Sequence, residues 1–161
     1  MLRCTKKLLA ILGASSVSEP GPAPDDDDWY ANLVWLDGRK CLLLAHVATL
    51  FTIFEPDVRA VDVQSMKSFV SSLIGRELHR EGLPRDTFAT SDDLVITRTA
   101  DRRVLGCMND MSYLCEAAVQ HTGSLEKTNI AALNHSLRRN MNSSRNYERP
   151  IDLTIARVEC G

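Results

Sequence analysis

The stretch WYANLVWLDGRKCLLLAH, residues 29–46, decides the fold of this chain. Its Asp37-Gly38 dipeptide lies between two apolar, aromatic-rich runs and is the favoured two-residue turn of a β-hairpin. Such a turn fixes the strand register, which places Trp29 opposite His46. Because both faces of the hairpin are largely apolar, we expect other elements to cover it on both sides, so that it forms the core of the protein.

Hydrophobic periodicity outside this hairpin predicts further strands and helices. Residues 94–107 predict a second hairpin that turns near Ala100-Asp101. Residues 47–54 fit a strand or a short helix, and residues 151–158 fit an edge strand or a final helix. The remaining patterns predict a strand over residues 2–4 and helices over residues 6–12, 65–81, about 109–120 and from about 129 onward.

Together these patterns predict a single α+β domain over residues 1–161, with two β-hairpins in a mostly antiparallel sheet and helices packed on it. Residues 14–27 are rich in Pro, Ser and Asp, and we expect them to form a flexible linker. The acidic run Asp25–Asp28 is expected to be a solvated loop. The expected core combines the first hairpin with the helix over residues 65–81, and its members are Trp29, Leu33, Leu42, Leu44, Phe69 and Leu73.

The overall composition is that of a globular protein. The chain has 161 residues, 44% of them hydrophobic, and a formal net charge of −2, so no global charge attracts it to nucleic acid or to an anionic membrane. No apolar run approaches the roughly 18 residues of a membrane span, and no secretory signal is evident. The five cysteines and four histidines lack the paired spacing of a zinc site. We therefore expect a cytoplasmic protein with no metal and no cofactor.

Four strings of the sequence together resemble a known family: LRCTKKLL from residue 2, DWYANLVWLDGRKCLLL from residue 28, TLFTIFEPDVR from residue 49 and VLGCMNDM from residue 104. The family is one of small prokaryotic proteins known only as a domain of unknown function. The resemblance extends from Met1 to about Tyr147 and implies a bacterial or archaeal cytoplasmic protein of one domain. It implies no activity and no catalytic residues.

The first hairpin carries the only side chains that we single out for catalysis. The chain contains no phosphate-binding glycine motif, no G-x-S-x-G motif and no H-E-x-x-H motif. In a catalytic site His46 would be the acid/base group, because histidine titrates near neutral pH. The register places Arg39 on the face of Asn32 and His46 on the other face, and a buried amide bonded to a neighbouring loop is an alternative role for Asn32. The catalytic candidates are Tyr30, Asn32, Arg39 and His46.

The segment HSLRRNMNSSRNYER, residues 135–149, is locally basic and rich in hydrogen-bonding side chains. This composition suits contacts with phosphates and with a single-stranded base. The same residues could instead form a solvated helix end, or bind an acidic partner or the chain's own Asp25–Asp28 run. The candidate contact residues are Arg138, Arg139, Arg145, Tyr147 and Arg149.

The second predicted hairpin has one unusual feature. It would place Arg98 directly opposite Arg103, where like charges repel. We expect the nearby Asp92, Asp93 or Asp101 to neutralise them, or else a bound anion to do so.

From these observations we expect a non-enzymatic cytoplasmic binding or regulatory protein, whose partner is a protein or a nucleic acid. The alternative is an enzyme that acts on RNA or a nucleotide with an acid/base histidine. A binding protein needs an exposed apolar or charged patch, whereas the enzyme needs its candidate side chains to converge in a pocket. The sequence leaves the oligomeric state open.

Overall fold

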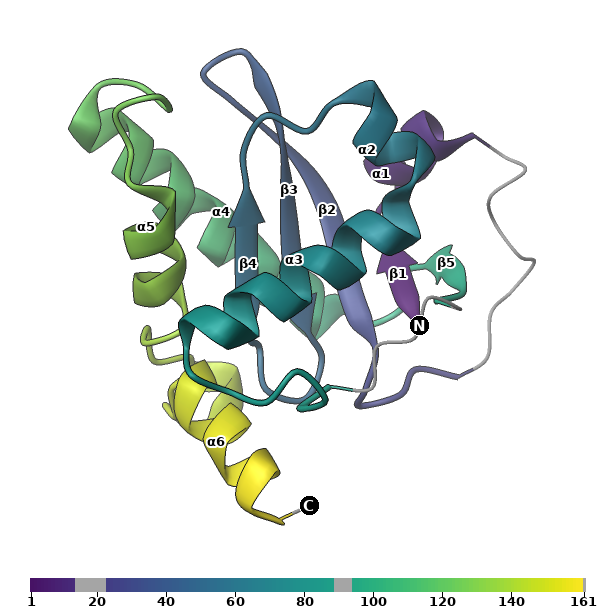
Figure 1. The fold of residues 1–161 in the computed structure, drawn as a ribbon, viewed down its shortest axis with the longest axis vertical. Helices are drawn as coiled ribbons and strands as arrows, with labels where there is room; N and C mark the ends of the chain where they lie inside the picture. Colours follow the sequence, from purple (N-terminus) through teal and green to yellow (C-terminus); the bar gives the residue numbers. More distant parts are fainter. Residues whose placement is uncertain (14–22, 89–93, 161) are drawn as a thin grey trace.

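A five-stranded sheet forms the centre of the protein in a computed structural model that describes residues 1–13, 23–88 and 94–160 (Figure 1). The strand order is β4-β3-β2-β1-β5. The first three of these strands are joined by antiparallel pairing, whereas β1 pairs in parallel with both β2 and β5. The strands are β1 (Leu2–Cys4), β2 (Trp29–Leu36), β3 (Arg39–His46), β4 (Thr52–Glu55) and β5 (Ile96–Arg98).

The hairpin of β2 and β3 has the predicted register, with Trp29 opposite His46 and Leu36 opposite Arg39. Asp37 and Gly38 at its turn both have positive φ angles, 52° and 70°. A type I′ turn requires this conformation at both central residues, and Asp-Gly adopts it readily. The strongest local signal in the sequence is therefore confirmed in detail.

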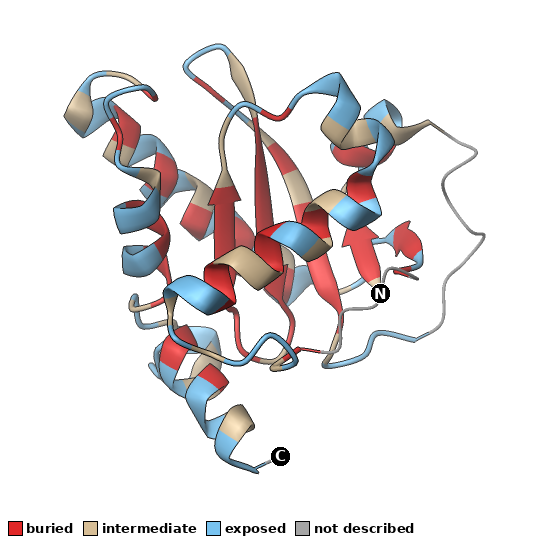
Figure 2. Cartoon of the chain, viewed as in Figure 1, coloured by how far each residue is buried: buried red, intermediate tan, exposed pale blue. Residues whose placement is uncertain are grey.

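Helices cover both faces of the sheet (Figure 1). Helices α1 and α3 contribute to one apolar layer, which contains Trp29 and Leu42, and α4 and α5 contribute to the other, which contains Tyr30 and Leu43. Figure 2 shows the buried residues concentrated in the strands and on the helix surfaces that face them. The helices are α1 (Lys6–Leu12), α2 (Ala60–Gln64), α3 (Met66–Arg80), α4 (Arg102–Thr122), α5 (Ile130–Leu137) and α6 (Pro150–Cys160), with a 3₁₀ turn η2 (Ser143–Arg145).

The predicted fold class is confirmed: the chain is an α+β domain with a mostly antiparallel sheet and helices packed on it. The predicted core is formed as well, and only Phe69 among its members is partly rather than fully buried. Of the two segments left open, residues 151–158 lie in the helix α6. Residues 52–54 belong to the strand β4, whereas residues 47–51 form neither a strand nor a helix.

The second hairpin, predicted over residues 94–107, does not form. Its first half is β5, but β5 pairs in parallel with β1, and α4 begins at Arg102. The side chain of Asp101 accepts a hydrogen bond from the backbone N–H of Arg103 at 2.7 Å and so caps this helix. Arg98 and Arg103 consequently do not face each other across a hairpin. The apolar run that resembled a strand belongs to the buried side of α4, whose members include Val104, Cys107, Met108 and Met111.

The acidic run departs from the expected solvated loop at its last residue. Asp28 is only 1% exposed and accepts a hydrogen bond from Nε of Arg3 at 2.5 Å. Asp27 forms an ion pair with Arg157 of α6. Within the predicted linker, residues 14–22 lie outside the described part of the chain.

Candidate functional site

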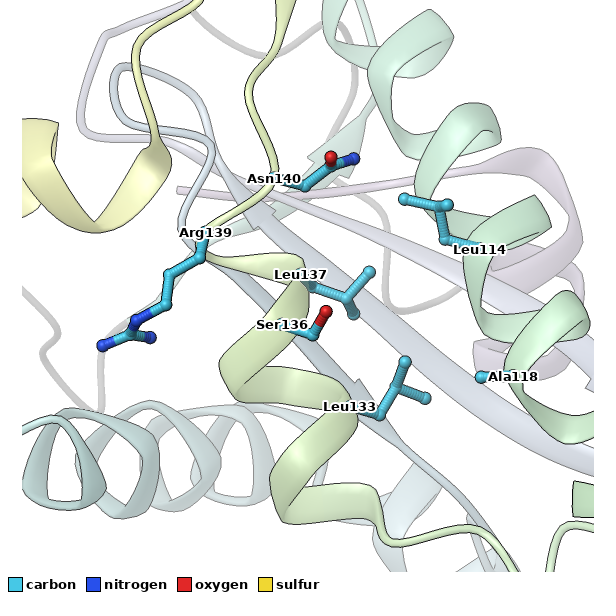
Figure 3. Close-up of a pocket in the computed structure, with 7 residues that line it drawn as sticks. All are labelled: Leu114, Ala118, Leu133, Ser136, Leu137, Arg139 and Asn140. Atoms are coloured by element: carbon cyan, nitrogen blue, oxygen red, sulfur yellow. The ribbon is translucent and has the colours of Figure 1, made fainter. Parts of the chain in front are cut away.

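A pocket of about 310 Å³ lies between α4 and α5 (Figure 3). Leu114 stands on its α4 side and remains 41% exposed, whereas Leu133 and Leu137 of α5 are buried. The pocket therefore presents an apolar floor that solvent reaches from one side. Its lining residues are Leu114, Ala118, Leu133, Ser136, Leu137, Arg139 and Asn140.

The polar groups of the pocket that have no partner in the described chain are uncharged. Within the described residues, neither the hydroxyl of Ser136 nor the side-chain amide of Asn140 forms a hydrogen bond, so both can serve a ligand. Arg139 contributes to the lining, but Figure 3 shows its guanidinium directed away from Leu114 and Leu137. That guanidinium binds Glu81 with both of its terminal nitrogens, at 2.8 and 3.1 Å. The pocket thus combines apolar side chains with two neutral hydrogen-bonding groups.

Helix α5, which forms one wall of the pocket, is fixed to the edge of the sheet. Its Asn134 is buried, accepts a hydrogen bond from the backbone N–H of Phe54 at 2.6 Å and donates one to the carbonyl of Phe54 at 2.9 Å. Just beyond the helix, Arg138 donates to the carbonyl of Thr52 at 3.1 Å. Two side chains therefore satisfy backbone groups of β4, and this attachment holds the pocket wall in place.

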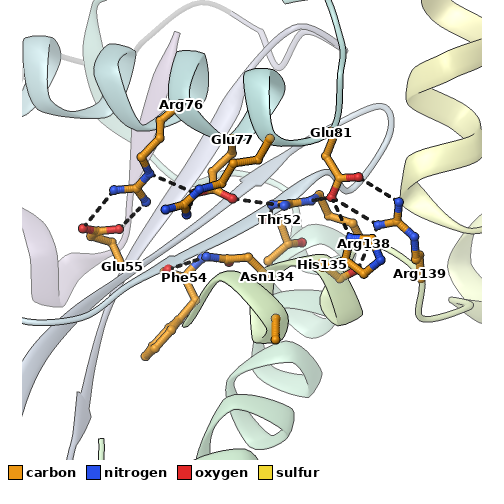
Figure 4. A network of polar contacts seen from close by, with 12 residues as sticks. Thr52, Phe54, Glu55, Arg76, Glu77, Glu81, Asn134, His135, Arg138 and Arg139 are labelled. Carbon is orange, nitrogen blue, oxygen red and sulfur yellow. Dashed lines mark hydrogen bonds and ion pairs between the residues drawn. The ribbon is translucent and has the colours of Figure 1, made fainter. Parts of the chain in front are cut away.

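A network of ion pairs behind the pocket joins α5 to α3 (Figure 4). Arg138 is at its centre and binds Glu77 at 3.0 Å and Glu81 at 2.7 Å. The aromatic ring of Phe51 packs against the same guanidinium, 4.8 Å from its carbon atom. Because all three charged groups of this cluster are buried, the pairing compensates for their removal from water.

The electrostatics of Glu81 reflect this network. Burial by itself raises the pKa of the Glu81 carboxyl, but hydrogen bonds from Arg139 and Arg138 outweigh burial, and the resulting pKa is below the ordinary value. The carboxylate form is therefore favoured in the folded protein. Glu81 is committed to holding two arginines rather than to exchanging protons.

The basic C-terminal segment lies differently from the expected contact surface. Arg138 is 1% exposed, so it cannot reach a partner, and its inclusion among the contact residues is wrong. The reason is that Glu77 and Glu81, more than fifty residues earlier in the chain, lie directly opposite it. Arg139 is held by the same Glu81.

The other predicted contact residues are dispersed. Arg145 donates to the carbonyl of Val47, and Arg149 forms an ion pair with Asp152 at 2.6 Å. Tyr147 is 67% exposed. The five residues therefore form no continuous cationic surface, and most of their charge is neutralised inside the chain.

The hairpin candidates have structural partners, and those of Tyr30, Asn32 and Arg39 lie in other elements of the chain. The buried hydroxyl of Tyr30 accepts hydrogen bonds from the backbone N–H groups of Ala100 and Asp101 at 3.2 and 2.8 Å. Asn32 accepts one from the hydroxyl of Thr5 at 2.8 Å. Arg39 lies at the surface near the hairpin turn, where it pairs with Asp57 and Glu126.

His46 is buried on the opposite face of the sheet from Tyr30. Its Nδ1 lies 3.1 Å from the Thr49 hydroxyl, and its ring packs 4.2 Å from that of Phe88, measured between ring centroids. Burial, followed by the positive charge of Arg157, lowers the pKa of His46 to about 3. The imidazole is therefore neutral at physiological pH. The structure does not bring Tyr30, Asn32, Arg39 and His46 together in one pocket.

The α4–α5 pocket was missed in the sequence because no local signal marks it. Its members come from two helices, and their apolar residues are the ordinary periodic ones that also build the core. Across the described ranges, no group of three or more His, Cys, Asp or Glu side chains is placed to hold a metal ion. No helix in the same ranges has the length and apolar character needed to cross a membrane.

A comparison with known protein families found one match. A family model described as a domain of unknown function, DUF6933, matches residues 1–153. A search of curated proteins found no match.

Proposed function

We propose that this chain, which belongs to the family of this domain of unknown function, is a binding protein. In this proposal the α4–α5 pocket receives an apolar side chain of a partner protein. The observation that carries this proposal is the composition of the pocket. Leucine side chains line it, and two neutral groups without partners in the described chain, those of Ser136 and Asn140, flank them. An extended or helical peptide offers an apolar side chain together with backbone groups that match such a site.

Charge favours a protein partner over a nucleic acid at this pocket. The arginine in its lining is bound to Glu81 and turned away from the cavity, so no free cation is available for a phosphate. Leu114 of the lining is 41% exposed, and its neighbour Tyr113 on α4 is 70% exposed. Aromatic and aliphatic groups of this kind contribute most of the energy at protein interfaces.

We place this binding protein in the cytoplasm. Cys4, Cys41, Cys107 and Cys115 are buried free thiols, and Cys160 is an exposed free thiol. An exposed free thiol in a chain with no disulfide among its five cysteines suits a reducing compartment.

Peptide selection tests the proposed pocket. A phage-displayed library of random peptides is selected against the wild-type protein, and the enriched peptides are then measured against two variants. Ser136→Trp fills the pocket with a large side chain, whereas Ala131→Trp adds the same side chain to α5 outside the lining.

We expect the enriched peptides to share apolar residues, to bind the wild type and Ala131→Trp equally, and to bind Ser136→Trp at least about tenfold more weakly, a loss typical of one interface anchor. Thermal melting of both variants controls for folding. Peptides that bind Ser136→Trp as well as the wild type would place the docking site elsewhere.

A further inference from the structure

Three arginines near the start of α4 are free of the ion pairing that engages most other arginines of the protein. Arg98, Arg102 and Arg103 are exposed, and in the described part of the chain none of them forms an ion pair or a side-chain hydrogen bond. By contrast, Arg76, Arg138 and Arg139 are each bound to one or two carboxylates. We call the three free arginines the Arg98–Arg103 patch.

The fold holds the backbone of this patch in one conformation. The buried Tyr30 hydroxyl accepts hydrogen bonds from Ala100 and Asp101, which lie between Arg98 and Arg102. Asp101 then caps α4 through the N–H of Arg103. Because this carboxylate already occupies the helix terminus, the free binding capacity of the patch lies in its guanidinium groups, not in the helix end.

Three free arginines within residues 98–103 are unexpected in a chain whose total charge is −2. Like charges in proximity repel, and an anion that binds several of them removes the repulsion. The cations lie on the surface rather than inside a cavity. A surface of this kind fits a ligand with many phosphates in a row better than a single small anion.

We propose that the Arg98–Arg103 patch binds the phosphate backbone of a nucleic acid. Guanidinium groups donate two parallel hydrogen bonds to a phosphate, which makes arginine suited to this role. The binding is independent of sequence, because backbone contacts carry no base information. This surface is separate from the α4–α5 pocket, so neither proposal depends on the other.

A pair of matched triple variants tests the proposal. The first is Arg98→Gln/Arg102→Gln/Arg103→Gln. The second, Lys67→Gln/Arg85→Gln/Lys127→Gln, removes three other exposed cations and so changes the net charge by the same amount. Fluorescence anisotropy measures the binding of labelled RNA and DNA of about 20 nucleotides at low salt, near 20 mM, and at moderate salt, near 200 mM. Circular dichroism confirms that each variant is folded.

We expect the wild type and the Lys67/Arg85/Lys127 variant to bind at low salt and to lose affinity steeply as salt rises. The Arg98/Arg102/Arg103 variant should bind at least about tenfold more weakly, with a shallower salt dependence, because about three phosphate contacts are lost. No binding by the wild type at low salt overturns the proposal, as does an equal loss in both triple variants. Binding of adenosine triphosphate as tight as that of the oligonucleotides would also overturn it, in favour of a small phosphate ligand.

Discussion

Arg138 carries its charge inside the molecule, where two carboxylates and a carbonyl surround it. Its three nitrogens donate to Glu81, Thr52 and Glu77. All of the guanidinium nitrogens therefore have partners, which is the condition under which a buried ion pair is tolerated. The residue joins α3, β4 and the end of α5, so its loss affects three elements at once.

Removing this side chain should destabilise the protein strongly. Arg138→Met removes the only buried partner of Glu77 and Glu81 among the described residues and leaves them with partly exposed arginines, Arg76 and Arg80 for Glu77 and Arg139 for Glu81. We expect the free energy of unfolding to fall by about 3 kcal/mol. Urea denaturation measures this change. Arg149→Met is the matched control, because the pair of Arg149 with Asp152 is largely exposed, and we expect it to change stability by less than about 1 kcal/mol. Equal effects of the two substitutions would contradict the assigned role.

His46 should make the stability of the protein depend on pH below neutrality. The pKa of His46 is about 3 in the folded chain, against 6.5 for an unperturbed histidine. Between these pH values the unfolded chain binds the extra proton, so the free energy of unfolding falls as pH falls, by up to about 1.4 kcal/mol per pH unit.

Urea denaturation between pH 7 and pH 4 should therefore show a steep loss of stability in the wild type and a shallower one in His46→Gln. His121→Gln, at an exposed position, should retain the wild-type slope. Below about pH 4 the carboxyls of Asp28 and Glu81 add to the loss, because their pKa values are lowered in the folded state. Parallel pH profiles for the wild type and His46→Gln would refute this role of the buried imidazole.

At the scale of elements, α5 protects the edge of the sheet. β4 is an outer strand, and the backbone groups on the free side of an outer strand can pair with another chain. Here Asn134 binds both the N–H and the carbonyl of Phe54, and Arg138 binds the carbonyl of Thr52. The outer side of β4 is thus occupied by side chains of the same molecule.

Asn134→Ala should open this edge. It removes two buried hydrogen bonds and leaves the backbone groups of Phe54 unpaired, so we expect a loss of about 2–4 kcal/mol in the free energy of unfolding. We also expect faster aggregation on heating, measured by light scattering, because the strand edge becomes available. Asn109→Ala, an exposed substitution in α4, should leave both quantities nearly unchanged. Unchanged stability of Asn134→Ala would show that the edge needs no such cover.

The elements that were predicted correctly have signals confined to their own residues. Asp37-Gly38 contains the whole turn of the first hairpin, and the apolar spacing of residues 66–78 contains the buried side of α3. β5 has only three residues, and its Ile96 pairs with Leu2, 94 residues earlier in the sequence. A pairing of that kind leaves no local pattern. The sequence therefore predicts a strand for the VLGC run that follows, whereas Asp101 caps a helix that begins at Arg102.

At the scale of the whole molecule, α4 brings two proposed surfaces onto one rigid element. Its first turn carries Arg102 and Arg103, and its later turns carry Leu114 and Ala118 of the pocket. Neither surface could be predicted from charge counts or periodicity, since a local count of arginines does not reveal which of them meet a carboxylate across the fold. The segment around Arg138 has the higher density of positive charge, yet Glu77 of α3 and Glu81, just after that helix, neutralise much of it.

The position of β1 in the sheet has a consequence for folding during synthesis. β1 comes first in the chain but has strands on both sides, β2 on one and β5 on the other. The ribosome completes β1, β2, β3 and β4 by Glu55, whereas the last residue of β5 is Arg98. At about 5–20 residues per second, the nascent chain exposes the unpaired side of β1 for several seconds. During that interval the backbone groups of β1 that later pair with β5 are open to pairing with another strand.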